Sequence, residues 1–168
     1  MKRKNNLYKN IYDLNNIMSV FNEVCKNTKN KKKVEEYRKL KCANIYHIQK
    51  ILKNKEYKVG KYYIFTIYEP KERTIVSQNM EDKIINHLIA RYILYPALIP
   101  CLIDANVASR KNMGVSKGLE LSNNYRKKCN IKYKDWYVLK CDISKFFFSI
   151  NHDILKDKIE RKIKINYA

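Results

Sequence analysis

The chain has 168 residues, 45% of them apolar or aromatic, which is enough to bury the core of one ordinary domain or of two small lobes. Its 36 Lys and Arg outnumber its 16 Asp and Glu, and the resulting net charge of +20 favours a polyanionic partner, either nucleic acid or an anionic membrane surface. The chain has only three glycines and three prolines, too few for a flexible Gly/Ser or Pro-rich linker. Its five scattered cysteines form no CxxC pair, which argues against a disulfide framework or a zinc knuckle and favours a reducing, cytoplasmic location. A lysine-rich composition can also reflect biased codon usage, with the lysines only solvating the surface.

The N-terminal part has the apolar spacing of helices. Apolar residues recur every three or four positions from Tyr8 to Cys25, and less regularly from Val34 to Leu52. The lysine-rich run at 29–33 interrupts the pattern and predicts an exposed turn. No apolar core of signal-peptide type follows the basic N-terminus.

The pattern then changes to that of a β-hairpin. Residues 62–68 and 73–77 are dense in β-branched and aromatic side chains, and Glu69-Pro70-Lys71-Glu72 between them has the composition of a turn.

A helix is predicted after the hairpin, because Asn79 can cap it and Glu81 and Asp82 suit its first turn. This helix is expected to end at Tyr95-Pro96. The apolar stretch at 88–103 contains a charge and two prolines, which favours a buried helix over a membrane span, so we expect no membrane partner.

The C-terminal part predicts one strand between two helices. A polar, irregular segment at 104–114 precedes a helix from Val115 or Ser116 to about Lys128. An apolar strand is predicted over 136–141, and an amphipathic helix over 152–163. Asp142 would then stand at the end of the strand, at the edge of a sheet.

Four blocks occur in the order found in reverse transcriptases, and together they resemble the bacterial retron-like and group II intron-like branch of that family. They are 57–65 with 69–75, which resembles the fingers hairpin; 81–87 with Pro96, the helix behind it; 106–118, an Arg-rich loop entering a helix; and 138–155, the first catalytic motif of the palm. The resemblance implies an α+β, right-hand polymerase fragment. Its parts would be an N-terminal helical segment (1–56), fingers (57–135) and the start of a palm (136–168), truncated after the first catalytic motif.

The resemblance implies that Asp142 is catalytic and holds Mg²⁺ or Mn²⁺ together with the backbone carbonyl of Ile143. Carboxylates suit this task because Mg²⁺ prefers hard oxygen ligands, and nucleotide addition uses two such ions. Phe147 would lie under the incoming sugar and exclude a ribose 2′-OH. Taken alone, Asp142 is better interpreted as an ordinary strand-end cap or turn, and it is the Phe-Phe and Ser-Ile-Asn-His that follow which favour the catalytic interpretation. At least one of Phe146, Phe147 and Phe148 is expected to pack in a core.

Two basic groups are expected to bind phosphates. By resemblance, Lys71 and Arg73 grip the incoming triphosphate, for which the planar guanidinium is well suited. The alternative is a solvated hairpin edge, which is as good an interpretation for Lys71.

The second basic group lies in the 106–118 block. Arg110, Lys111, Gly114 and Lys117 would contact the template strand, with Gly114 allowing close backbone approach. A generic basic loop explains each of these residues equally well.

The sequence therefore predicts part of an RNA-directed DNA polymerase that uses an RNA template, a DNA primer and deoxynucleoside triphosphates. No paired Asp-Asp hairpin follows Asp142 in these 168 residues, so the part alone is expected to be inactive unless a second chain completes the palm. Two alternatives stay open: a non-catalytic RNA- or DNA-binding module, and a related palm polymerase that makes RNA or untemplated products. Template identity, priming mode and biological role are not encoded in readable motifs.

Overall fold

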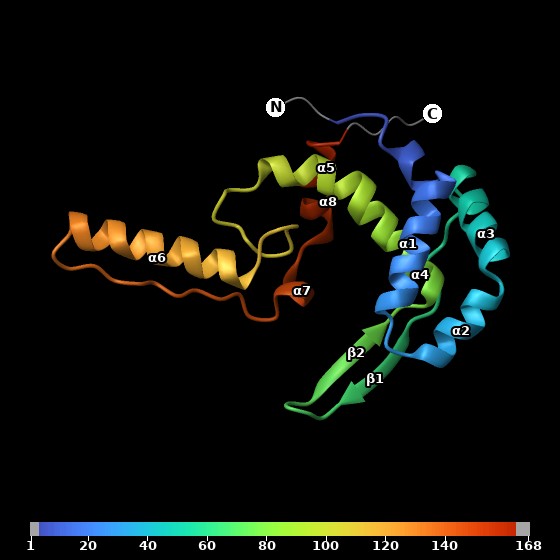
Figure 1. The fold of residues 1–168 in the computed structure, drawn as a ribbon, viewed down its shortest axis with the longest axis horizontal. Helices are drawn as coiled ribbons and strands as arrows, with labels where there is room; N and C mark the ends of the chain where they lie inside the picture. The colour runs from blue at the N-terminus through green and yellow to red at the C-terminus, as the bar shows by residue number, and fades with distance from the viewer. Residues whose placement is uncertain (1–3, 164–168) are drawn as a thin grey trace. The chain divides into compact units, whose positions relative to one another are not determined.

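The computed structural model describes residues 4–163 and divides the chain into two compact units, Lys4–Ala97 and the part from Leu98 onward (Figure 1). The regular elements of residues 4–163 are helices and one two-stranded sheet, which confirms the predicted mixture of helix and sheet. The N-terminal helices and the hairpin belong to the same unit.

The first unit begins with a short 3-10 helix, Tyr8–Ile11, and then α1, Leu14–Asn27. Asp13 caps α1 by accepting a hydrogen bond from the Asn16 N–H at 3.0 Å. The helical spacing of this region is thus confirmed, with a break before Asp13 that the apolar pattern did not reveal.

The predicted exposed turn is confirmed at residues 29–30, but its extension over 31–33 and the single helix after it are wrong. Asn30 accepts a hydrogen bond from the Lys33 N–H, and this cap starts α2, Lys31–Lys39, inside the lysine run. Leu40 then leaves the helical conformation, and α3, Lys41–Lys53, follows. The Asn44 amide donates to the Tyr37 carbonyl at 2.9 Å, which satisfies a carbonyl at the end of α2 and stabilises the break.

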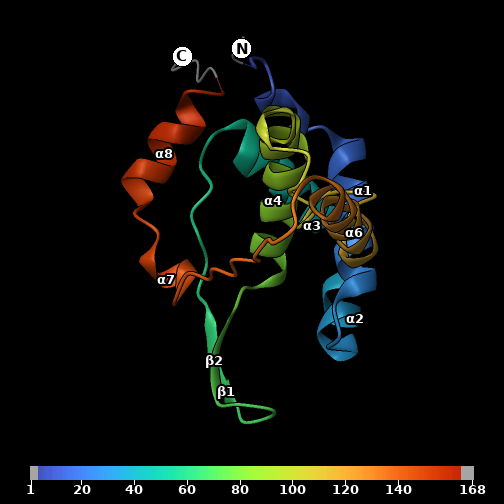
Figure 2. The same cartoon turned by 90° about the vertical axis from the view of Figure 1, so that its left-hand side faces the viewer.

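The predicted hairpin is confirmed. Strand β1, Tyr63–Ile67, pairs antiparallel with β2, Arg73–Ser77, and Phe65 lies opposite Ile75. The hairpin extends away from the helices of its unit (Figures 1 and 2).

Helix α4, Met80–Ile89, follows the hairpin, and its predicted cap is confirmed because Asn79 accepts from the Asp82 N–H at 2.7 Å. The predicted end at Tyr95-Pro96 is wrong. A π turn, Ala90–Leu94, leads into α5, Tyr95–Leu98, and a 3-10 turn, Ile99–Cys101. In a π turn the N–H groups reach five residues back, so the helical path passes Pro96 without the α-helical bond that proline cannot make.

Helices α1 and α4 pack against each other at the centre of the first unit. Phe21 is fully buried there, and its ring stacks on that of Tyr37 with centroids 5.5 Å apart. The buried cluster comprises Ile11, Ile17, Val20, Phe21, Val24, Cys25, Val34, Ile45, Ile48, Leu52, Met80, Ile84, Ile85 and Leu88. Residues Met80–Cys101 are long and apolar enough to cross a membrane by length and composition, but Ile84, Ile85 and Leu88 are fully buried in this core.

The second unit consists of exposed helices. Helix α6, Val115–Lys132, and α8, His152–Glu160, confirm the two predicted helices, and a short α7, Phe146–Ser149, lies between them in the chain. None of the residues of these three helices is buried.

The predicted strand at 136–141 is wrong. These residues form no strand, and Tyr137 and Leu139 are 95% and 88% exposed. A strand needs a neighbour to pair its N–H and C=O groups, and the described residues supply none at this place.

Candidate functional site

A buried carboxylate holds the chain where it enters the hairpin. Asp82, in the first turn of α4, is 1% exposed. It accepts hydrogen bonds from the Tyr57 hydroxyl at 2.8 Å, the Gly60 N–H at 3.1 Å and the Asn79 amide at 3.0 Å. These contacts tie the segment before β1 to the helix after β2, and we call Tyr57, Gly60, Asn79 and Asp82 the hairpin anchor.

The anchor requires glycine at position 60. A Cβ there would lie 2.2 Å from the Asn79 amide nitrogen and 3.1 Å from the Asp82 carboxylate. Burial, and then the hydrogen bond to Asp82, raise the pKa of the Tyr57 hydroxyl, so this group stays a proton donor to the carboxylate.

The sequence interpretation assigned Asp82 only a favourable place in a helical first turn. Its position three residues after the capping Asn79 could have indicated a contact between the two residues, because a capping box has the same spacing; here the carboxylate accepts from the Asn79 side-chain amide instead of its backbone N–H. Nothing local in the sequence indicates the contacts with Tyr57 and Gly60.

The hairpin carries the two residues predicted to bind triphosphate. Arg73 begins β2 opposite Ile67, and Lys71 lies in the turn; both are exposed. Directly paired residues share one face of a sheet, and faces alternate along each strand, so Arg73 lies on the same face as Phe65 and Tyr63. The predicted phosphate-binding side chain is therefore accessible on a face that also presents aromatic rings.

Two of the four residues predicted to contact the template, Arg110 and Lys117, make contacts with nearby residues of the chain itself. The Arg110 guanidinium donates to the backbone carbonyls of Asn106 at 3.0 Å and Ile103 at 3.2 Å. Lys117 pairs with Glu120 at 2.7 Å.

Two residues of this loop are less constrained. Lys111 is exposed, and Gly114 has a φ of +133° with open space where a Cβ would be. Gly114 immediately precedes α6, so its left-handed backbone sets the direction in which the chain enters that helix. Of the four residues predicted to contact the template, Lys111 and Gly114 are thus the two that a ligand could approach without displacing a neighbouring side chain.

Asp142 lies in an exposed segment without regular structure, just before a turn at 144–145, rather than at the edge of a sheet, because the strand before it does not form. Its carboxylate accepts a hydrogen bond from the Ile143 N–H at 2.9 Å. Lys145, with a φ of +49°, then reverses the chain into α7, and Asn151 caps α8 through the N–H groups of Asp153 and Ile154. The resemblance predicts a strand, a turn and a helix in this order. The structure has the turn and the helix, but an unpaired segment stands in place of the strand.

None of the three phenylalanines of α7 is buried, so the expectation that at least one packs in a core is wrong. Phe147 and Phe148 are 82% and 90% exposed, and Phe146 contacts Phe147 edge to face with centroids 5.4 Å apart. Phe147 is thus available to contact a ligand.

At this position the chain offers a metal ion one carboxylate, that of Asp142. Mg²⁺ is usually bound through one or two carboxylates together with substrate phosphates, so Asp142 and the Ile143 carbonyl fit part of one site. Over residues 4–163 no group of three or more His, Cys, Asp or Glu side chains converges on a common point. The donor set therefore falls short of a two-ion centre.

The predicted site residues fall in both units. Lys71 and Arg73 belong to the first unit, whereas the loop at 110–117 and the turn at 142–147 belong to the second. No protein-family model matches the chain, and no curated protein matches it.

Proposed function

We propose that the chain forms part of an RNA-directed DNA polymerase, with the hairpin binding the incoming nucleotide and Asp142 contributing to the catalytic centre. The observation that carries this proposal is the hairpin itself. It forms with the expected bounds, and Arg73 and Lys71 are exposed at the end far from the anchored helices. A guanidinium at that position can contact two phosphate oxygens at once.

The unpaired segment before Asp142 also supports the proposal. Residues 137–139 are apolar and 79–95% exposed, which is unfavourable for a segment in water and typical of a strand without its neighbours. A polymerase palm would supply those neighbours from polypeptide outside these 168 residues, together with the further carboxylates that one Asp cannot replace.

Each residue has a definite role in this proposal. Arg73 and Lys71 bind and orient the triphosphate, which brings the reacting phosphorus near the primer end. Asp142 and the Ile143 carbonyl hold a Mg²⁺ or Mn²⁺ ion, whose chemistry is to neutralise charge on the phosphate oxygens. Phe147 presents a rigid ring beside the sugar, so that an additional 2′-OH is excluded by contact alone.

Primer extension on an RNA template tests the proposal, with the protein at its natural length and Mg²⁺ present. Asp142→Asn keeps the side-chain shape but removes the charge, so extension should be lost while template binding stays nearly unchanged. Asp135→Asn is the matched control, because Asp135 is an exposed carboxylate seven residues earlier. Extension that survives Asp142→Asn would rule out the catalytic assignment. The 168 residues alone should not extend a primer.

Two further variants separate the roles. Phe147→Ala should raise ribonucleotide incorporation relative to deoxyribonucleotide incorporation, whereas Phe148→Ala, which alters an equally exposed neighbouring ring, should not. Arg73→Ala should raise the KM for the triphosphate, with Arg38→Ala as a control on the exposed surface of α2. Equal effects from each variant and its control would contradict the assignment.

A second candidate is a nucleic-acid-binding module without chemistry. It is favoured by the net charge of +20. Salt-dependent binding of nucleic acid, with no Asp142-dependent extension at natural length, would select this candidate.

A further inference from the structure

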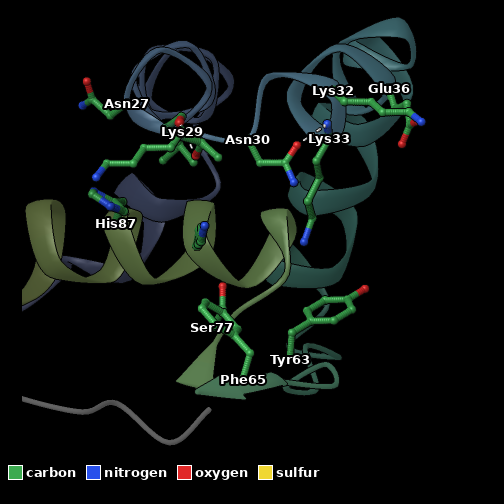
Figure 3. A pocket seen from close by; sticks show the side chains of 13 residues that line it. Asn27, Lys29, Asn30, Lys32, Lys33, Glu36, Tyr63, Phe65, Ser77 and His87 are labelled. Atoms are coloured by element: carbon green, nitrogen blue, oxygen red, sulfur yellow. Dashed lines mark hydrogen bonds between the residues drawn. The ribbon is translucent and has the colours of Figure 1, made fainter. Parts of the chain in front are cut away.

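A basic pocket of about 1050 Å³ lies entirely within the first unit, enclosed by the α1–α2 connection, one face of the hairpin and α4 (Figure 3). Its cationic and titratable lining consists of Lys29, Lys32, Lys33, Lys83 and His87. Glu36 is its one acidic residue among those that the structure describes. None of these residues belongs to the sites considered so far.

The charge of the basic pocket is not neutralised internally. In the part of the chain that the structure describes, none of the four pocket lysines forms an ion pair. The Lys33 ammonium lies 4.4 Å from the centre of the Tyr63 ring and so joins α2 to the hairpin by a cation–π contact. Several cations held around one concavity with a single carboxylate favour an anionic ligand.

The hairpin wall of the pocket is aromatic. Tyr63 and Phe65 line it from alternate positions of β1 and are 57% and 50% exposed. Ser77 lies opposite Tyr63, so the wall belongs to one face of the sheet. The same face continues along β1 to Ile67, which pairs with Arg73. Ile67 is four residues from Tyr63, or about 13 Å at the usual rise of a strand.

We propose that the basic pocket binds single-stranded nucleic acid, with phosphates on the lysines and bases on Tyr63 and Phe65. Exposed rings beside cations are the combination that binds single strands, because unpaired bases offer faces for stacking and the backbone offers charge. Duplex bases are already stacked on one another and do not offer these faces. The bound strand runs along the hairpin face from the pocket toward Arg73.

Fluorescence anisotropy with labelled oligouridylate, on the full 168-residue protein, tests this site. The pocket variant Lys29→Gln/Lys33→Gln/Lys83→Gln is compared with Lys39→Gln/Lys50→Gln/Lys53→Gln, which removes the same charge from exposed positions of α2 and α3 in the same unit. The slope of log affinity against log salt should fall by about 2 in the pocket variant, at about 0.7 per phosphate lost. The control should change the slope less.

The aromatic wall has its own variants. Tyr63→Ala should weaken oligouridylate binding by about 5- to 150-fold, the usual range for loss of stacking on one base. Tyr46→Ala, at an exposed tyrosine of α3 outside the pocket, should leave binding unchanged. Binding of a blunt RNA duplex should respond to the lysine variants but not to Tyr63→Ala.

Three outcomes would overturn the proposal: equal losses in the pocket and control lysine variants, no loss in Tyr63→Ala, or pocket-dependent binding of anionic vesicles in place of oligouridylate. Photo-crosslinking of the unmodified protein to a thiouridine-containing oligonucleotide tests the site without any substitution, so its result does not depend on whether a variant folds. Crosslinks should map to 29–36 and 63–65, and crosslinks elsewhere alone would refute the site. The inference does not depend on polymerase chemistry, because Asp142→Asn should leave all of these measurements unchanged.

Discussion

The hairpin anchor provides the sharpest test of how this fold is stabilised. Asp82 accepts three hydrogen bonds while being 1% exposed, so removing its charge or its oxygens affects several donors at once. Asp82→Asn preserves the volume but turns one oxygen into an NH₂ group. The NH₂ group is tolerated best facing the Tyr57 hydroxyl, which can accept a hydrogen bond. It is not tolerated facing Asn79, whose oxygen already accepts from the residue 82 N–H.

The magnitudes follow from this geometry. A hydrogen bond to a charged group contributes about 1.5–3 kcal/mol and a neutral one about 0.5–1.5 kcal/mol, so Asp82→Asn should cost about 2 kcal/mol. Asp82→Ala leaves the three donors without an acceptor, at about 1–3 kcal/mol each, and should cost about 3–5 kcal/mol after partial hydration. For a unit of this size, each kcal/mol lowers the Tm by about 4–8 °C.

Urea unfolding followed by the helical circular-dichroism signal measures both losses, since Trp136 lies in the second unit and its fluorescence does not report on the anchor. Asp13→Asn is the matched control, because Asp13 caps α1 at an exposed position where Asn serves equally well. The reasoning is refuted if Asp82→Asn costs no more than Asp13→Asn. It is also refuted if Asp82→Ala costs no more than Asp82→Asn.

Three further results are expected in the same assay. Gly60→Ala should destabilise by about 1–3 kcal/mol because its Cβ overlaps the capping amide. Gly118→Ala lies within α6, and its Cβ meets only the side chain of Val107, so it should be neutral or stabilising by up to about 1 kcal/mol. The raised pKa of Tyr57 means that the folded state holds this proton more tightly than the unfolded state, whose pKa is about 10. Its contribution is therefore complete below pH 10 and lost above it, and Tyr57→Phe should flatten the fall in stability at alkaline pH. Glu23→Gln, which breaks the partly exposed pair with Arg91, should cost less than about 1 kcal/mol and lose even that at high salt.

Local signals in the sequence predicted most of the first unit. The hairpin was predicted because β-branched and aromatic residues flank a Pro-containing turn, and α4 because Asn79 precedes an apolar periodic run. The errors at 29–52 also have a local cause. Asn30 is as good a cap as Asn79, but the lysines after it carry no apolar spacing, and the pattern therefore indicated a turn.

The candidate site was less predictable, because its key contacts join residues far apart in the chain. Tyr57 and Asp82 are 25 positions apart, and their bond follows from packing rather than from any motif. The basic pocket likewise combines lysines on α1–α2 and α4 with rings on β1, and only the fold brings them around one cavity.

The segment before Asp142 shows how strand prediction depends on partners. Residues 137–139 form a continuous apolar run, the pattern of a strand that is covered on both faces and paired on both edges. Local preference can make such a segment extended, but pairing needs backbone groups from elsewhere. The same argument applies to Phe147 and Phe148, which are exposed in α7. Because apolar exposure on this scale is unfavourable in water, residues 137–139 and α7 form an apolar surface of the second unit, and Asp142 lies between these two exposed stretches of the chain.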